Sequence, residues 1–197
     1  HINGVCKEMY KFESMHLRGL KEIQEKGITP YPHNISITHT LEESRMLIGE
    51  RTKEELEGDS QIVNVAGRVM LKRKMGKAGF ATLQDPSGTL QVYVSKNDLS
   101  ADDFAHWKAC SNGDHVQLTG TFMRTRTGEA TINAKTFQLA SKCITSLPDK
   151  HKGLQDVETR SRSRYVDLFM NDSSRETFQR RSQTNTTSFR WSGLRTP

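Results

Sequence analysis

The strongest constraint on the fold is a change of hydrophobic period after residue 58, from helical spacing to strict alternation. Alternating segments lie at 63–71, 79–84 and 89–95, a helical pattern follows Ser100, and two more alternating segments begin at His115 and Ala130. Three strands, a helix and two strands within about ninety residues is the order of a five-stranded OB barrel, in which the helix closes one end. From this order alone, another small β-rich barrel or an α+β domain remains the alternative.

Helical patterns precede the barrel. The apolar spacing of residues 7–26 predicts one amphipathic helix that ends at Gly27. Two capping boxes, Thr40 to Glu43 and Thr52 to Glu55, predict two further short helices. The expected fold is therefore mainly β with helices, a five-stranded OB-fold barrel preceded by an N-terminal helical extension.

We expect four regions along the chain. Residues 1–58 are the helical extension, 59–147 the barrel, 148–183 a connector and 184–197 a divergent tail. The tail opens with Thr184-Asn-Thr-Thr-Ser188, whose β-branched and short polar side chains disfavour a helix. We therefore predict that the tail is disordered.

Composition narrows the class of protein. The three cysteines are far apart and lack any metal-ligand spacing, so we expect no disulfide and no metal site. No stretch approaches the ~20 apolar residues of a membrane span, which predicts a cytoplasmic protein without a membrane segment. Lys and Arg number 8 against 11 acidic residues before residue 61, but 12 against 7 in 61–150 and 9 against 5 beyond. A basic body suits a polyanion such as nucleic acid, although many ordinary surfaces are mildly basic.

Alternation also separates the two faces of the predicted sheet. Phe80 shares a polar face with Thr82, beside a strand that presents Gln91 and Tyr93 and another that presents Arg68. Such a face can stack bases and bind their edges. The other interpretation, that Phe80 packs beneath a helix or the N-terminal extension, is equally open.

Two predicted loops add positive charge beside this face. Lys72, Arg73, Lys74 and Lys77 lie in the first loop, and Arg124 and Arg126 lie in the loop between strands four and five. These loops flank the binding face of OB folds, so the six cations are candidates for contacts with the phosphate backbone. A solvated basic turn is the alternative.

Several strings resemble the anticodon-binding region of class II lysyl-tRNA synthetases. They are Val65-Ala-Gly-Arg-Val69, Met75-Gly-Lys-Ala-Gly-Phe-Ala-Thr-Leu-Gln-Asp85, Gly88-Thr-Leu-Gln-Val-Tyr-Val94, Arg126-Thr-Gly-Glu129, Leu147-Pro-Asp-Lys150 and Arg164-Tyr-Val-Asp-Leu168. By this resemblance, Phe80 stacks on an anticodon base, and Arg68, Gln91 and Glu129 contact anticodon bases or nearby backbone. A turn carboxylate paired with Arg124 or Arg126 is the alternative role for Glu129.

The resemblance implies the tRNA-binding portion of a lysine-tRNA ligase, truncated before the catalytic domain. Its partner would be the anticodon stem-loop of tRNA(Lys). We expect no catalytic residue and no cofactor in this chain, which alone would be inactive; ATP and Mg²⁺ are implied for the full-length enzyme. The full-length family member would be a homodimer, and this fragment a monomer. The alternative is a stand-alone OB module that binds single-stranded nucleic acid or a protein partner.

Overall fold

The computed structural model describes residues 17–25, 27–58, 61–144, 147, 154 and 156–193. The chain divides into two units, His1–Ser146 and Leu147–Pro197, and each is described by itself. Most of the predicted connector motif that starts at Leu147 lies outside the described residues.

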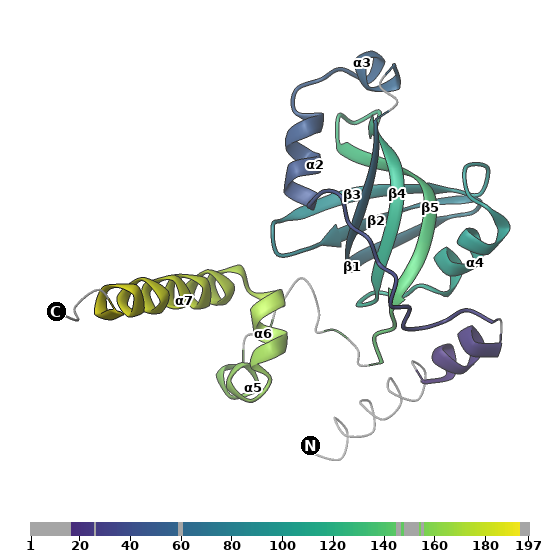
Figure 1. Ribbon diagram of the computed structural model, residues 1–197. Helices are drawn as coiled ribbons and strands as arrows, with labels where there is room; N and C mark the ends of the chain where they lie inside the picture. The colour runs from purple at the N-terminus through teal and green to yellow at the C-terminus, as the bar shows by residue number, and fades with distance from the viewer. Residues whose placement is uncertain are drawn as a thin grey trace. The chain divides into compact units, whose positions relative to one another are not determined.

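Five strands form a closed barrel in the first unit (Figure 1). Their order around the barrel is β1-β2-β3-β5-β4, with β3 and β5 parallel and the other pairs antiparallel. The strands are β1 (Ile62–Met75), β2 (Ala78–Gln84), β3 (Thr89–Ser95), β4 (His115–Arg124) and β5 (Ala130–Ser141). This confirms the OB barrel expected from the order of the sequence patterns.

Helix α4 (Ala101–Ala109) lies between β3 and β4 in the chain and covers one end of the barrel. It begins where the Ser100 hydroxyl accepts a hydrogen bond from the Asp103 amide. Its Trp107 side chain is 2% exposed and meets the Phe137 ring edge to face, with centroids 5.4 Å apart. The barrel core is thus closed by an aromatic pair.

The alternation along β1 is interrupted by a bulge between Val69 and Leu71. Val63, Val65 and Val69 face the core as predicted, but beyond the bulge Lys72 lies opposite the buried Ala81, and Leu71 lies opposite Thr82 on the outer face. The sequence pattern had placed Leu71 inside, and this was wrong because one extra residue reverses every later side chain.

The predicted basic loop is also shorter than expected. Strand β1 continues to Met75, so Lys72, Arg73 and Lys74 are strand residues rather than loop residues. Only Gly76 and Lys77 separate β1 from β2, and Gly76 supplies the positive φ of 63° that the turn needs. Pairing with β2 to the very end of the hairpin stabilises this longer strand.

The N-terminal extension contains a helix over residues 17–25, α2 (Leu41–Ile48) and α3 (Lys53–Glu57). The first ends before Gly27, which has φ 71° as expected of a helix terminator. The part of that predicted helix before residue 17 lies outside the described residues. Both predicted capping boxes are present, on Thr40 and Thr52.

The second unit contains α5 (Val157–Arg162), α6 (Arg164–Met170) and α7 (Asp172–Gly193). The fully buried Asp167 carboxylate joins them, since it accepts from Arg160 Nε at 2.8 Å, Arg164 at 2.7 Å and Asn171 Nδ2 at 2.6 Å. Burial alone would raise the pKa of Asp167, but these donors lower it to about 2.

Helix α7 runs past residue 184, where the sequence predicted disorder. The Thr184 and Thr186 hydroxyls donate to the carbonyls of Arg180 and Ser182, four residues earlier, at 2.9 Å. In this geometry the hydroxyls bond within the helix instead of competing with it. The expectation for residues 184–193 therefore differs from the structure, and residues 194–197 lie outside the described part.

Candidate nucleic-acid interface

The outer face of the barrel carries an aromatic pair on two adjacent strands. Phe80 of β2 lies directly opposite Tyr93 of β3, and their ring centroids are 5.1 Å apart with an interplanar angle of 50°. Both side chains are half-buried, so part of each ring is open to solvent. Exposed aromatic rings on an OB sheet form the usual platform for nucleic-acid bases.

A cavity of about 490 Å³, named here the aromatic cavity, opens over this pair. Its walls come from four strands, β1 to β4, and the β4–β5 loop. The lining residues are Leu71, Arg73, Met75, Phe80, Ala81, Thr82, Gln91, Tyr93, Met123, Thr125, Arg126 and Thr127. Its apolar floor and cationic rim suit a flat base attached to a phosphate. Of the predicted residues, Phe80, Gln91, Arg73 and Arg126 meet here.

A second cavity of about 420 Å³, the polar cavity, adjoins the first, because Thr82 and Gln91 line both. Glu129 lines the polar cavity, so the structure brings the predicted Gln91 and Glu129 together. The Gln91 amide donates to Thr131 Oγ1 at 3.1 Å, which fixes its orientation. Within the described part of the chain, the Glu129 carboxylate is exposed and forms no ion pair with Arg124 or Arg126. The alternative role of a paired turn carboxylate therefore finds no support.

Arg124 is half-buried and is engaged by the backbone. Its guanidinium donates to the carbonyls of Gly128, Gly49 and Arg51, at 2.6, 2.6 and 3.0 Å. The last two belong to the segment that joins α2 to α3. Arg124 therefore also joins the barrel to the N-terminal extension, with three carbonyl acceptors on its planar fork of donors, and its phosphate contact stays a prediction.

Lys72 is turned away from the interface. Its ammonium donates to the carbonyls of Trp107 and Cys110 at the end of α4, and lies 4.3 Å from the centroid of the Trp107 ring. Burial lowers the pKa of Lys72 from 10.5 to about 8. Burial also raises the pKa of the neighbouring Cys110 thiol to about 12. The bulge in β1 is the physical reason why this lysine cannot contact phosphate from the outer face.

Arg68 lines neither cavity. It lies opposite Gln84 and His115 in the sheet, and its guanidinium donates to the Gly113 carbonyl at 3.0 Å. Burial and, after it, the nearby Arg68 charge lower the pKa of His115. Arg68 is on the same outer face of the sheet as Phe80, but it lies opposite Gln84, four residues from Phe80 along β2, and so does not meet Phe80, Gln91 and Glu129 in either cavity.

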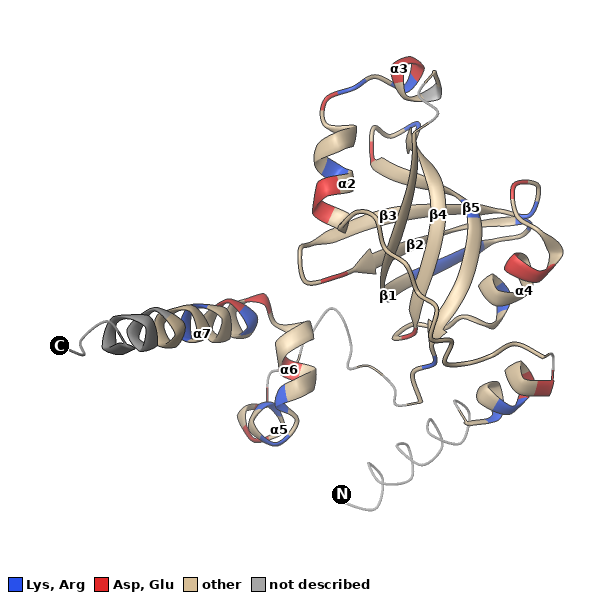
Figure 2. Ribbon diagram, viewed as in Figure 1, with Lys and Arg blue, Asp and Glu red and all other residues tan. Residues whose placement is uncertain are grey.

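The remaining predicted cations are exposed. Lys74 and Lys77 lie at the β1–β2 hairpin, and Arg126 lies in the β4–β5 loop. Figure 2 shows basic residues on the barrel strands, whereas acidic residues gather at the starts of α2, α3 and α4. Charge is therefore distributed so that the sheet and its loops, not the helix starts, are open to an anion.

Sequence reasoning missed several residues at this interface, four of which carry sulfur or charge. Met75 and Met123 line the aromatic cavity, and Arg45 and Glu50 line the polar cavity. Met123 could have been found by continuing the alternation of strand four past Phe122. Arg45 and Glu50 carry no local signal, since only the docking of α2 on the barrel brings them there.

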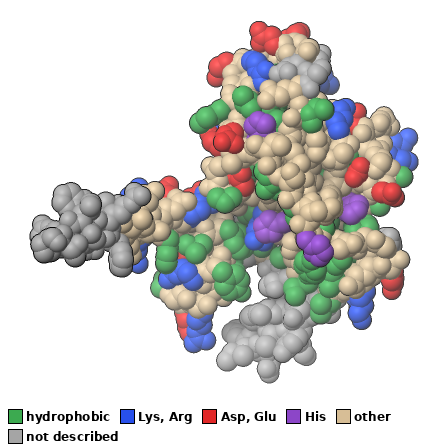
Figure 3. Space-filling view, in the orientation of Figure 1, with side chains coloured by type: hydrophobic (Ala, Val, Ile, Leu, Met, Phe, Trp, Pro, Cys, Tyr) green, Lys and Arg blue, Asp and Glu red, His purple; other side chains and the backbone are tan. Residues whose placement is uncertain are grey.

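The surface and the titratable groups of the described residues limit which other kinds of site the structure offers. On the face shown in Figure 3, hydrophobic side chains form separate patches among larger polar areas. The described residues include no group of three or more His, Cys, Asp or Glu that could hold a metal ion. Among the helices that the structure describes, none is long and apolar enough to cross a bilayer.

The geometry and the sequence together define the class of this barrel. Residues 63–140 match the model of the family described as the OB-fold nucleic acid binding domain, and the barrel is similar to that family. The chain, with barrel residues included, is similar to part of proteins named lysine--tRNA ligase. It is 41% identical over 181 residues to the protein of Staphylococcus epidermidis, 41% over 164 residues to that of Bacillus subtilis, and 47% over 156 residues to that of Neisseria meningitidis serogroup B.

These matches cover 91%, 83% and 78% of this chain but 37%, 33% and 30% of the relatives. The chain therefore spans about a third of the length of the curated relatives it matches. The similarity extends on both sides of the barrel, because the alignment with the Staphylococcus epidermidis protein has 181 residues and the domain match has bounds 63 and 140.

Proposed function

We propose that this chain binds the anticodon stem-loop of a lysine tRNA, with one base stacked on Phe80. The observation that carries the proposal is the aromatic cavity, in which a half-buried aromatic pair, the oriented Gln91 amide and the Arg73 cation meet on an OB barrel. The stacked base would lie on the ring while Gln91 bonds its edge. Arg73, Arg126, Lys74 and Lys77 would neutralise phosphates around it.

The similarity to lysine--tRNA ligases supports tRNA as the nucleic acid. For the whole protein, the same similarity supports a proposal of lysine ligation to tRNA in the cytoplasm, with ATP and Mg²⁺, by a homodimer. The part argued from geometry in this chain is the binding step alone. Its readout must therefore be binding, not aminoacylation.

The test compares an RNA hairpin with the anticodon loop of tRNA(Lys) against the same stem with a scrambled loop. Stacking contributes about 1–3 kcal/mol per base, so Phe80→Ala should weaken binding of the matching hairpin by about fivefold to a hundredfold. Phe80→Leu is the matched control for packing, because it keeps an apolar side chain of similar volume while removing the ring. We expect both variants to lose affinity.

Three results would contradict the proposal. Equal binding of both hairpins would identify a general single-strand binder, the alternative function. Unchanged affinity in Phe80→Ala with a lowered melting temperature would make Phe80 a packing residue. If Phe80→Ala loses affinity but Phe80→Leu binds as tightly as the wild type, the RNA uses apolar contact and not stacking.

A further inference from the structure

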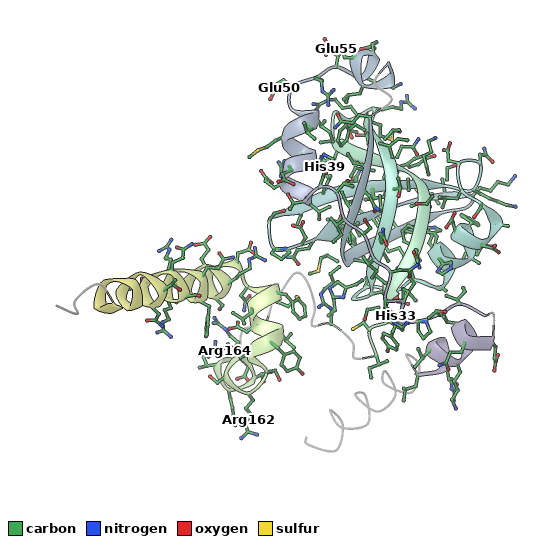
Figure 4. All side chains as sticks on the ribbon, viewed as in Figure 1. His33, His39, Glu50, Glu55, Arg162 and Arg164 are labelled. Carbon is green, nitrogen blue, oxygen red and sulfur yellow. The ribbon has the colours of Figure 1, made fainter. Side chains whose placement is uncertain are left out.

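Helix α2 of the N-terminal extension forms one wall of the polar cavity. Arg45, Gly49 and Glu50 come from α2 and the residues directly after it, and they face Gln91 and Glu129 of the barrel across the same space. Figure 4 shows Glu50 just beyond α2, and α3 with Glu55 farther from the strands. The cavity therefore exists only because the extension is docked on the barrel.

The wall is held at both of its ends. At the N-terminus of α2, the Leu41 amide donates to Asp85 Oδ2 at 2.9 Å and the Glu42 amide donates to Ser87 Oγ at 3.1 Å. At its C-terminus, Arg124 binds the Gly49 and Arg51 carbonyls. The buried Leu41 and Ile48 side chains add apolar contacts with the core. An element fixed in this way presents its side chains in a set position, which lowers the entropic cost of binding.

Arg45 is the side chain that this wall offers to a ligand. It is exposed, and in the described part of the structure its guanidinium has neither a hydrogen bond nor an ion pair. The other arginine of the cavity, Arg124, is already occupied by carbonyls. Arg45 is thus the cavity's available fork of donors, a group suited to phosphate oxygens.

The opposite wall has a different requirement. Glu129 brings a carboxylate that accepts hydrogen bonds and repels anions, and Glu50, just after α2, adds a second carboxylate to the cavity. An occupant must therefore offer N–H donors at one end and anionic oxygens at the other, with the anion directed to Arg45. A nucleotide has both, in its base and its phosphate. Because the two cavities share Thr82 and Gln91, this nucleotide would adjoin the one stacked on Phe80.

We propose that the nucleotide next to the stacked base enters the polar cavity and that Arg45 of helix α2 binds its phosphate. This inference rests on the proposed function and makes the N-terminal extension part of the RNA-binding surface. Without Arg45, Glu50 and Glu129 would face the phosphate uncompensated. Arg45→Gln should therefore weaken hairpin binding by about fivefold to tenfold, since hydrogen bonds to charged groups are among the stronger ones and this one is exposed.

The experiment measures hairpin affinity as a function of salt for wild type and variants. Arg45→Gln should reduce the slope of log K against log salt by about 0.7, the value for one phosphate contact on single-stranded RNA. Arg45→Lys should retain the slope because it retains the charge. Arg18→Gln is the matched control, an exposed arginine on the helix over residues 17–25 that lines neither cavity.

A second arm locates the phosphate. Methylphosphonate linkages, which are uncharged, replace the loop phosphates one at a time. We expect one position at which the Arg45→Gln effect disappears, next to the nucleotide that is sensitive to Phe80→Ala. If Phe80→Ala weakens binding but Arg45→Gln behaves like Arg18→Gln, the inference is wrong and the proposed function stands. If the wild-type chain binds neither hairpin, both are wrong.

Discussion

Lys72 and Arg73 are adjacent cations whose roles the β1 bulge separates, and exchanging each for methionine tests that separation. Arg73 lines the aromatic cavity, whereas the Lys72 ammonium lies against the Trp107 ring and the carbonyls that end α4. Methionine keeps most of either stem and removes the charge. We expect Arg73→Met to act on RNA binding and Lys72→Met to act on stability.

The expected effect of Lys72 on the free energy of unfolding follows from its pKa, which burial lowers from 10.5 to about 8. Between these two values the unfolded chain binds more protons than the folded chain, so the free energy of unfolding rises with pH across that window. At about 1.36 kcal/mol per pKa unit, the rise is at most ~3 kcal/mol. The carbonyl acceptors of Trp107 and Cys110 favour the ammonium form, which makes this an upper bound. Lys72→Met has no such group and should lack this rise.

Urea titrations at pH 7 to 10.5 measure the difference between wild type and Lys72→Met. A Trp191→Phe background leaves Trp107 as the single tryptophan, so that fluorescence reports on the barrel. As pH rises, the free energy of unfolding of the wild type should increase relative to that of Lys72→Met. In hairpin binding at pH 7, Lys72→Met should keep the wild-type salt slope, while Arg73→Met should reduce it by about 0.7. Equal reductions in both variants, or a stability difference that does not change with pH, would refute the reasoning.

Two further substitutions test the barrel. Asp114→Ala should lower the free energy of unfolding by about 3–5 kcal/mol in a urea titration, because it leaves the buried Lys142 ammonium, 2.7 Å from the Asp114 carboxylate, without its ion-pair partner. The control is Asp98→Ala, which breaks the exposed ion pair with Lys135 and should lower the free energy of unfolding by under about 1 kcal/mol. Comparable costs would contradict this. Gly120→Ala should lower the melting temperature, since the new Cβ would lie 2.3 Å from the Asn133 carbonyl oxygen. The control is Gly19→Ala, because Gly19 has open space around it. An unchanged melting temperature for Gly120→Ala would count against the close strand packing.

The patterns that predicted the fold correctly are local ones. Alternation located all five strands, Thr40 and Thr52 marked two helix starts, and Gly27 marked a helix end. Each depends on residues within a few positions of one another, so it can be read from the sequence. The expected disorder after Thr184 stays a prediction, and the structure instead draws residues 184–193 in α7, where the Thr184 hydroxyl bonds to the carbonyl four residues earlier.

The site was only partly predictable for a different reason. Phe80, Gln91 and Tyr93 lie on regular strands without a bulge between β2 and β3, so alternation placed them together on one face. Lys72 follows the β1 bulge, and one inserted residue is enough to turn it away from that face, whereas Arg68 stays on the outer face but lies opposite Gln84, away from Phe80. The pattern of apolar residues in β1 does not reveal the bulge, because Leu71 continues the alternation through it.

By itself, the sequence determined the number and order of the barrel's elements and the aromatic face, since these follow from periods and caps set by near neighbours. Only the tertiary structure decided which cations remain free to bind a ligand. Arg124 finds its acceptors at Gly49 and Arg51, and Lys72 finds its acceptors at Trp107 and Cys110. Long cationic side chains bind whichever carbonyls the fold brings within reach, and those carbonyls come from segments that are distant in the chain. The same docking that occupied Arg124 placed Arg45 at the polar cavity.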